Sequence, residues 1–334
     1  MTEPARESPT GPAEDAQVRA EPALIGLDLG GTSVRAVVTG PGGVLHRAAV
    51  RHTARGYPAV LALLEQMVAQ GQQAVAPRPV RAVGLAVAGW LSADREHLIA
   101  AANLGVTGMP LRRELEQRLG VPVAVENDGN TAALAEARAG AGRSSRMLVM
   151  LTLGTGVGGG IVASGALLTG AAGLAGELGH LPSADDGPVC VCGGRGCLEV
   201  YASGPAVVRH VVEAGYAGPG GVLTAEDVVA AARAGEPEAV DALAVAGEAV
   251  GRAVARLVPV LNPDLVLLGG GLATGATDLV LIPARRALAD STPLSTVAAA
   301  PPVRLATGGA DAGALGASYL PDISDRRTPA GASA

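Results

Sequence analysis

The segments LIGLDLGGTSVRAVV, residues 24–38, and MLVMLTLGTGVGGGIV, residues 147–162, follow one pattern. Each is an apolar run, a turn rich in glycine and threonine, and a second apolar run, which predicts a β-hairpin. A further turn, at residues 40–43 and 164–165, and a third short strand follow each hairpin. Because the pattern occurs twice, it predicts a duplicated α/β architecture with one copy in each half of the chain.

Strands and helices alternate along the rest of the sequence, as expected of an α/β protein. Expected strands cover residues 80–87, 121–126 and 265–268. Thr224 and Asp227 have the spacing of a capping box. Expected helices cover residues 59–71, 111–119, 131–139, 205–214, 224–234, 236–261 and 310–320.

This order predicts two domains. A small α/β domain is expected over residues 23–127 and a large one over residues 128–308, with the C-terminal helix, 309–321, packing back on the small domain. Residues 1–22 and 322–334 lack apolar periodicity and are expected to be disordered tails.

Composition narrows the function class. The chain has 334 residues, a net charge of −6 and 49% hydrophobic residues. Its acidic balance disfavours a nucleic-acid partner. No apolar run is long enough for a membrane span, and the N-terminal residues are not the apolar segment that a signal peptide needs. We therefore expect a soluble cytoplasmic protein. Lysine is absent, so a nucleotide cannot be held by a Gly-x-x-x-x-Gly-Lys loop.

All three cysteines lie in one loop, as Cys190, Cys192 and Cys197, and His180 precedes them. Three thiolates and an imidazole form the donor set that structural Zn²⁺ prefers. A disulfide with one free thiol is the alternative, but the glycines inside the loop favour a metal knuckle. Glu177 and Glu199 flank the cluster and could complete a polar ligand pocket.

The glycine-rich turns predict phosphate binding. In the first, Gly30, Gly31 and Thr32 offer backbone N–H groups and a hydroxyl, and Asp28 could hold hydrated Mg²⁺. In the second, the glycine content of residues 154–160 exceeds what folding alone would select. Two such hairpins across a cleft would clamp a nucleoside triphosphate. The residues expected to contact it are Asp28, Gly30, Gly31, Thr32, Gly154, Thr155, Gly156, Gly270 and Gly271; for the last two, a tight turn is the alternative.

Glu126-Asn127-Asp128 comes at the end of a predicted strand, where α/β proteins form ligand crevices. Asp128 precedes a predicted helix, so one interpretation is an N-cap. The other is a general base that takes a proton from a substrate hydroxyl. The phosphate turns and the carboxylates near the cysteine loop favour the catalytic interpretation.

These motifs, in this order, resemble those of the ROK family of sugar kinases and repressors over about residues 24–320. Ala88-Gly89, Asn103-Leu104 and the segment 201–206 are similar to actinobacterial ATP-dependent glucokinases within that family. The motifs are Asp28-x-Gly30-Gly31-Thr32, Glu126-Asn127-Asp128, Leu153-Gly154-Thr155-Gly156-Val157-Gly158-Gly159-Gly160, Gly176-Glu177-Leu178-Gly179-His180 and Cys190-x-Cys192-Gly193-x-x-Gly196-Cys197-x-Glu199.

The resemblance implies the actin-like, RNase H-type two-domain fold with a zinc-knuckle loop. It implies that Asp128 deprotonates the 6-hydroxyl of glucose for attack on the γ-phosphate of Mg-ATP, and that His180 contacts both zinc and sugar. It also implies a homo-oligomer. The residues that it places at the sugar are Ala88, Gly89, Asn103, Asn127, Gly156, Glu177, His180 and Glu199.

Three departures from the family pattern bear on function. Gly129 stands where alanine is usual and is expected to loosen the helix start, Ser33 and Gly40 stand where lysine and aspartate are frequent, and Val106-Thr107 replaces a frequent tryptophan. Alternatives are a kinase for N-acetylglucosamine, N-acetylmannosamine, mannose, fructose or allose, a kinase using polyphosphate, and a sugar-responsive repressor. A repressor would need a winged helix-turn-helix, for which the residues before the first strand are too few.

Overall fold

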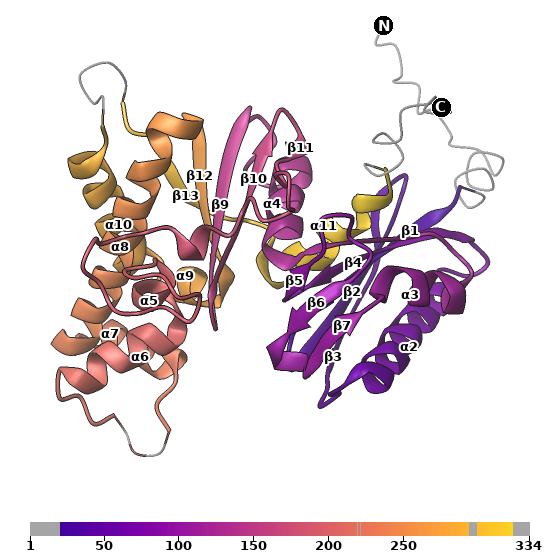
Figure 1. The fold of residues 1–334 in the computed structure, drawn as a ribbon, viewed down its shortest axis with the longest axis horizontal. Helices are drawn as coiled ribbons and strands as arrows, with labels where there is room; N and C mark the ends of the chain where they lie inside the picture. The colour runs from indigo at the N-terminus through magenta and orange to yellow at the C-terminus, as the bar shows by residue number, and fades with distance from the viewer. Residues whose placement is uncertain (1–20, 219, 221, 294–298, 323–334) are drawn as a thin grey trace, which may run out of the picture.

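The computed structural model describes residues 21–218, 220, 222–293 and 299–322 (Figure 1). Most of the two predicted tails, residues 1–20 and 323–334, lies outside this range. Within it, no helix is long and apolar enough to cross a membrane. The chain forms two lobes, each built on a five-stranded sheet.

The first sheet has the strand order β3-β2-β1-β4-β8. β1, β2 and β3 form the predicted antiparallel meander, and β4 and β8 run parallel to β1. Val87 of β4 pairs with Leu29 of β1 and with Asn127 of β8, so these parallel strands end at the same edge of the sheet. The strands are β1 (Ala23–Leu29), β2 (Ser33–Gly40), β3 (Gly43–Arg51), β4 (Val80–Val87) and β8 (Val123–Asn127).

The second sheet repeats this plan, in the order β11-β10-β9-β12-β13. β9, β10 and β11 are antiparallel, whereas β12 is parallel to β9 and β13 is parallel to β12. The duplication expected from the two hairpins is therefore present in the topology. The strands are β9 (Met147–Leu153), β10 (Val157–Ala163), β11 (Ala166–Leu167), β12 (Leu265–Gly269) and β13 (Val303–Leu305).

A small third sheet, β5-β6-β7, is inserted between β4 and α3. Its strands are β5 (Trp90–Leu91), β6 (Leu98–Ala101) and β7 (Val106–Met109), with the short 3-10 helix η1 (Ala102–Leu104) between the last two. Two other 3-10 turns are η2 (Leu178–His180) and η3 (Gly309–Asp311). The sequence motifs did not predict this sheet, because its strands are short and lack clear alternation.

The predicted helices are present, with ends shifted by a few residues. The Thr224–Asp227 capping box at the start of α7 is confirmed, with both reciprocal hydrogen bonds made. The helices are α2 (Tyr57–Val75), α3 (Leu111–Leu119), α4 (Asp128–Ala139), α5 (Glu199–Ala202), α6 (Gly204–Glu213), α7 (Ala225–Ala234), α8 (Pro237–Leu261), α9 (Gly270–Ala276), α10 (Asp278–Ser291) and α11 (Ala312–Ser318).

α4 and α11 pack against each other between the two sheets (Figure 1). α11 covers β1 and β4, and α4 lies on β9 and β10. One buried cluster accordingly includes Ala86 of β4, Ala133 of α4, Met150 of β9 and Ala317 of α11. Small residues at these contacts let the four layers approach closely.

The glycines of β10 have a packing role. A methyl group at Gly160 would lie 2.7 Å from the Cβ of Ala133, and one at Gly159 would lie 2.7 Å from Leu178. At the start of α4, a methyl group at Gly129 would lie 2.5 Å from the carbonyl oxygen of Gly159. The expectation that the glycine content of residues 154–160 exceeds what folding alone would select was therefore wrong for Gly159 and Gly160, because close packing leaves no room there for a methyl group.

We expect Gly84→Ala to destabilise the protein by about 1–3 kcal/mol, because its methyl group would overlap the backbone carbonyl of Ala317 in α11. Gly42→Ala is the control, since no atom lies within 4 Å of its added methyl group. Urea unfolding of both variants tests this, and equal midpoints would show that α11 is not held closely against β4.

Candidate active site

Two carboxylates share one cavity between the sheets. Asp28 at the end of β1 and Asp128 at the start of α4 line a space of about 340 Å³. Most other lining residues are small, including Gly269, Gly270 and Gly271. Such a cavity leaves room for phosphate groups beside the two acids.

Burial raises the pKa of both carboxyls. The pKa of Asp128 rises from its usual 3.8 to about 6, mainly through loss of water and further through the negative charge of Glu177. The pKa of Asp28 rises to about 7, through burial and then the charge of Asp128, while Arg35 opposes the rise. A base that titrates near neutral pH can take a proton from a substrate hydroxyl.

Asn127, and not Asp128, is the N-cap of α4. Its side-chain oxygen accepts hydrogen bonds from the backbone N–H groups of Gly129 and Asn130, at 2.8 and 3.2 Å. The N-cap interpretation of Asp128 was therefore wrong, because the helix begins at Asp128 itself. Oδ1 of Asp128 accepts from the Gly129 N–H at 2.9 Å. This bond and a side-chain hydrogen bond with Asn127 oppose the rise in the pKa of Asp128. The carboxylate also lines the cavity, where a ligand can reach it.

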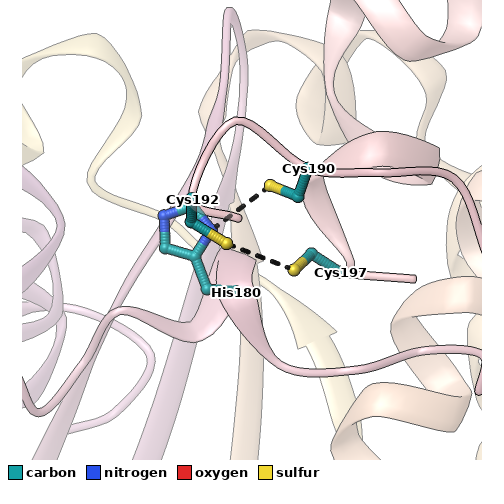
Figure 2. A group of neighbouring side chains, drawn as sticks. All are labelled: His180, Cys190, Cys192 and Cys197. Atoms are coloured by element: carbon teal, nitrogen blue, oxygen red, sulfur yellow. Dashed lines mark hydrogen bonds between the residues drawn. The ribbon is translucent and has the colours of Figure 1, made fainter. Parts of the chain in front are cut away.

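His180, Cys190, Cys192 and Cys197 point toward one another (Figure 2). Their donor atoms all lie within 4.8 Å of each other, with 3.7 Å from Cys190 Sγ to His180 Nδ1 and 3.6 Å from Cys192 Sγ to Cys197 Sγ. A tetrahedral ion with Zn–S bonds of about 2.3 Å separates its sulfur ligands by about 3.8 Å. All three cysteines are free, so the structure does not show the disulfide of the alternative interpretation. The cluster is compatible with zinc.

The acids beside this cluster gather near Asp128. Glu199, at the start of α5, accepts a hydrogen bond from the Val157 N–H at 3.0 Å and lies against Gly156. Burial raises the pKa of Glu177, with His180 opposing the rise and Glu199 adding to it. Because His180 directs Nδ1 toward Cys190, its Nε2 is left for another partner. These predicted sugar ligands are thus brought together with the predicted base.

The remaining predicted sugar residues come from the first lobe. Asn103 lies in η1, where its Cβ would come within 2.8 Å of a methyl group at Gly31 in the first hairpin turn. Gly89 packs against the carbonyl of Ala100, and the Ala88 N–H donates to Leu29 at 3.4 Å. Asn127 uses its side-chain oxygen as the helix cap, so its amide N–H₂ group is what it can offer a sugar.

A larger cavity of about 790 Å³ adjoins the carboxylate cavity through Gly271, which lines both. Gly154 and Thr155 of the second hairpin line it, together with Gly204 at the start of α6. Gly270 begins α9, so the predicted glycine run forms a strand-to-helix junction. Gly30 and Thr32 lie at the tip between β1 and β2. The larger cavity is also lined by residues that no motif predicted for a ligand site: Arg209, Val212, Leu223, Thr224, Glu226 and Val229.

The sequence motifs gave no structural role to two buried carboxylates near the site, those of Glu136 and Glu126. Glu136 of α4 is fully buried and accepts from the backbone N–H groups of Thr307 and Gly308, at 2.7 and 2.5 Å. It thereby holds the segment 306–313, which forms one wall of the carboxylate cavity. Glu126 forms an ion pair with Arg95. The one sequence signal for such groups is an acid on an otherwise apolar helix or strand face.

The model of the ROK family matches residues 24–322 of this chain. The chain belongs to the ROK family. It is 38% identical to a glucokinase of Halalkalibacterium halodurans over 71% of this chain and 75% of that protein. It is 36% identical to a glucokinase of Streptomyces coelicolor over 78% of this chain and 86% of that protein.

Among solved ROK structures, a glucokinase from Streptomyces griseus in complex with glucose and AMPPNP is similar, with a TM-score of 0.78 and 34% identity. The match covers 89% of this chain and 98% of that one. The actin-like, two-domain α/β fold predicted for this chain is therefore confirmed.

We expect Asp128→Asn to stabilise the protein at pH 8 but not at pH 4. A carboxyl whose pKa is higher in the folded than in the unfolded protein lowers the stability as the pH rises above the unfolded pKa. For Asp128 this loss of stability is complete above its folded pKa of about 6. The gain at pH 8 is at most about 3 kcal/mol, reduced by water in the cavity. Urea unfolding at both pH values measures it, with Asp186→Asn, at an exposed site, as control. Equal gains at both pH values would contradict the raised pKa.

Proposed function

We propose that this ROK protein is an ATP-dependent glucokinase that transfers the γ-phosphoryl group of ATP to the 6-hydroxyl of glucose. The observation that carries the proposal is the position of Asp128, which shares a cavity with Asp28 and is influenced electrostatically by Glu177. The similarity to glucokinases named above, one of them bound to glucose and an ATP analogue, supports this choice of substrates.

Asp128 acts as the general base. Its carboxylate accepts the proton of the sugar hydroxyl as the hydroxyl oxygen attacks the γ-phosphorus and the bond from that phosphorus to ADP breaks. The raised pKa of Asp128 brings it closer to that of the hydroxyl proton while leaving the carboxylate mostly ionised at pH 7. Phosphoryl transfer depends chiefly on such positioning and on charge neutralisation.

The sugar is held by acceptors and donors that surround Asp128. Glu177 and Glu199 accept hydrogen bonds from ring hydroxyls, and Nε2 of His180 makes a third contact. Asn103 and the amide group of Asn127 complete the site, with the backbone at Ala88, Gly89 and Gly156 close to the ring. Closure of the site around the bound sugar also excludes water, which would otherwise compete as the acceptor.

ATP lies across the two cavities. Its adenosine occupies the larger one, and its phosphates reach Asp28 and the turns at Gly30–Thr32, Gly154–Gly156 and Gly270–Gly271. The N–H groups of Gly30 and Gly154 already donate to the carbonyls of Ser33 and Gly156 within these turns. Mg²⁺ bound with the nucleotide would be held by Asp28 and would neutralise phosphate charge, a role consistent with the excess of acid in that cavity.

His180, Cys190, Cys192 and Cys197 hold one structural Zn²⁺ in this proposal. When bound, the ion supplies a fixed point for the loop and for the His180 ring, so that Nε2 faces the sugar.

We further propose two lobes that close around the sugar, one formed by residues 23–127 with 309–321 and the other by residues 128–308. A cytoplasmic homo-oligomer is the expected form of the enzyme.

We expect wild-type protein to phosphorylate glucose with ATP, and Asp128→Asn to lower kcat by about 10²–10⁴-fold without loss of glucose binding. Wild-type kcat/KM should fall below about pH 6, where Asp128 becomes protonated. Initial rates over pH 5–9 test this, with Asp186→Asn as control. The wild type is also assayed with mannose, fructose, N-acetylglucosamine and N-acetylmannosamine, and with polyphosphate. Activity of Asp128→Asn within a few-fold of wild type would remove Asp128 as the base.

We expect one Zn²⁺ per chain by elemental analysis, and loss of both metal and activity in Cys192→Ser, because metal binding stabilises the local fold. Val191→Ala, at a side chain 94% exposed on the same loop, is the control and should keep the metal. Full activity in metal-free protein would contradict the zinc proposal.

A further inference from the structure

A buried ion pair joins the inserted sheet to the strand that leads to the base. Arg95, in the loop between β5 and β6, contacts Glu126 of β8 in a bidentate pair through one edge of its guanidinium, with Nη2 to Oε1 at 2.9 Å and Nε to Oε2 at 3.1 Å. The two side chains are only 14% and 6% exposed. Glu126 stands two residues before Asp128.

The same two side chains reach the other lobe. Arg95 Nη2 donates to the carbonyl of Gly173 at 3.2 Å, in the loop that leads to Glu177. Glu126 Oε1 accepts from Asn130 Nδ2 at 3.1 Å, and Asn130 lies against Gly176 of that loop. The loop 173–176 is therefore contacted at both ends by one polar network.

The side chains of Arg95 and Asn130 are packed closely against the loop 173–176. A methyl group at Gly173 would overlap Arg95, and one at Gly176 would lie 2.8 Å from Asn130 Oδ1. That oxygen is buried and accepts no hydrogen bond from the described residues.

Stability alone does not account for this arrangement. A buried ion pair is often no more stabilising than apolar residues of similar size. Its position is more informative: Arg95 belongs to the insert that carries Asn103, Glu126 belongs to the segment that carries Asp128, and Gly173 belongs to the loop that carries Glu177. The three segments proposed to surround the sugar meet at one guanidinium.

We propose that Arg95, Glu126 and Asn130 form a positioning network that fixes the 173–177 loop against the base and thereby sets the affinity for sugar. The proposal rests on the proposed function, since it assumes that Glu177 binds the sugar. Arg95 does not touch the sugar in this account; it acts through the carbonyl of Gly173 and the carboxylate of Glu126.

The test compares two variants. Arg95→Lys keeps the charge but loses the forked guanidinium that spans Glu126 and Gly173. The neutral pair Arg95→Met/Glu126→Gln leaves no unpaired buried charge. Arg112→Lys is the matched control, because Arg112 also pairs with glutamates, Glu96 and Glu116, but at the surface of the same lobe. Glu177→Gln is the reference for direct loss of a sugar contact.

We expect Arg95→Lys and the neutral pair to raise the KM for glucose about tenfold, with the KM for ATP and the melting temperature nearly unchanged. Calorimetric titration with glucose should show the same weakening, and Arg112→Lys should match wild type. A purely structural network would lower the melting temperature and leave the two KM values in their wild-type ratio.

Normal glucose KM in the folded network variants, together with a raised value in Glu177→Gln, would overturn the network proposal and leave the sugar site intact. Normal KM in Glu177→Gln as well would place the error in the sugar site. Failure of both network variants to fold would assign the network to stability and equally overturn the proposal. If wild type prefers another sugar of the panel, that sugar replaces glucose in every measurement.

Discussion

The close approach of α4 and α11 between the two sheets is the constraint on which the rest of the structure depends. Glycines at the contacts, such as Gly84 under α11 and Gly160 under α4, let backbone lie against backbone. With no bulky side chains between them, the end of β1 and the start of α4 open into one cavity. The packing therefore determines how near Asp28 and Asp128 come to each other.

This proximity has an energetic consequence. Loss of water and the charge of Asp128 raise the pKa of Asp28. Ionising both acids at neutral pH therefore lowers the stability of the folded chain. Active sites commonly carry such a cost, because the same electrostatics make a carboxylate a better base and attract cations. The stability lost here is balanced by the large apolar cores of the two lobes.

α4 holds the segments on either side of the candidate site in position. At its first turn, Asn127 caps the helix and Asn130 contacts the Glu126 carboxylate, which pairs with Arg95. Near its last turn, Glu136 binds the backbone of Thr307 and Gly308 beside the wall of the carboxylate cavity. Both buried carboxylates are satisfied by donors from other segments, so the loops on either side of the cavity are oriented by one rigid helix.

The sequence by itself determined the local elements, the duplicated plan and the gathering of the cysteines, because each depends on residues near in the chain. Turn chemistry predicted the two hairpins, and the Thr224–Asp227 spacing predicted a cap. The tertiary structure alone decided which glycines admit a helix, that Asn127 and not Asp128 is the cap, and that Arg95 and Glu136 are held by residues distant in the chain. Their partners, Gly173 and Thr307, are 78 and 171 residues away along the chain. The burial and pairing of a charge depend on segments that meet only after the sheets and helices have packed.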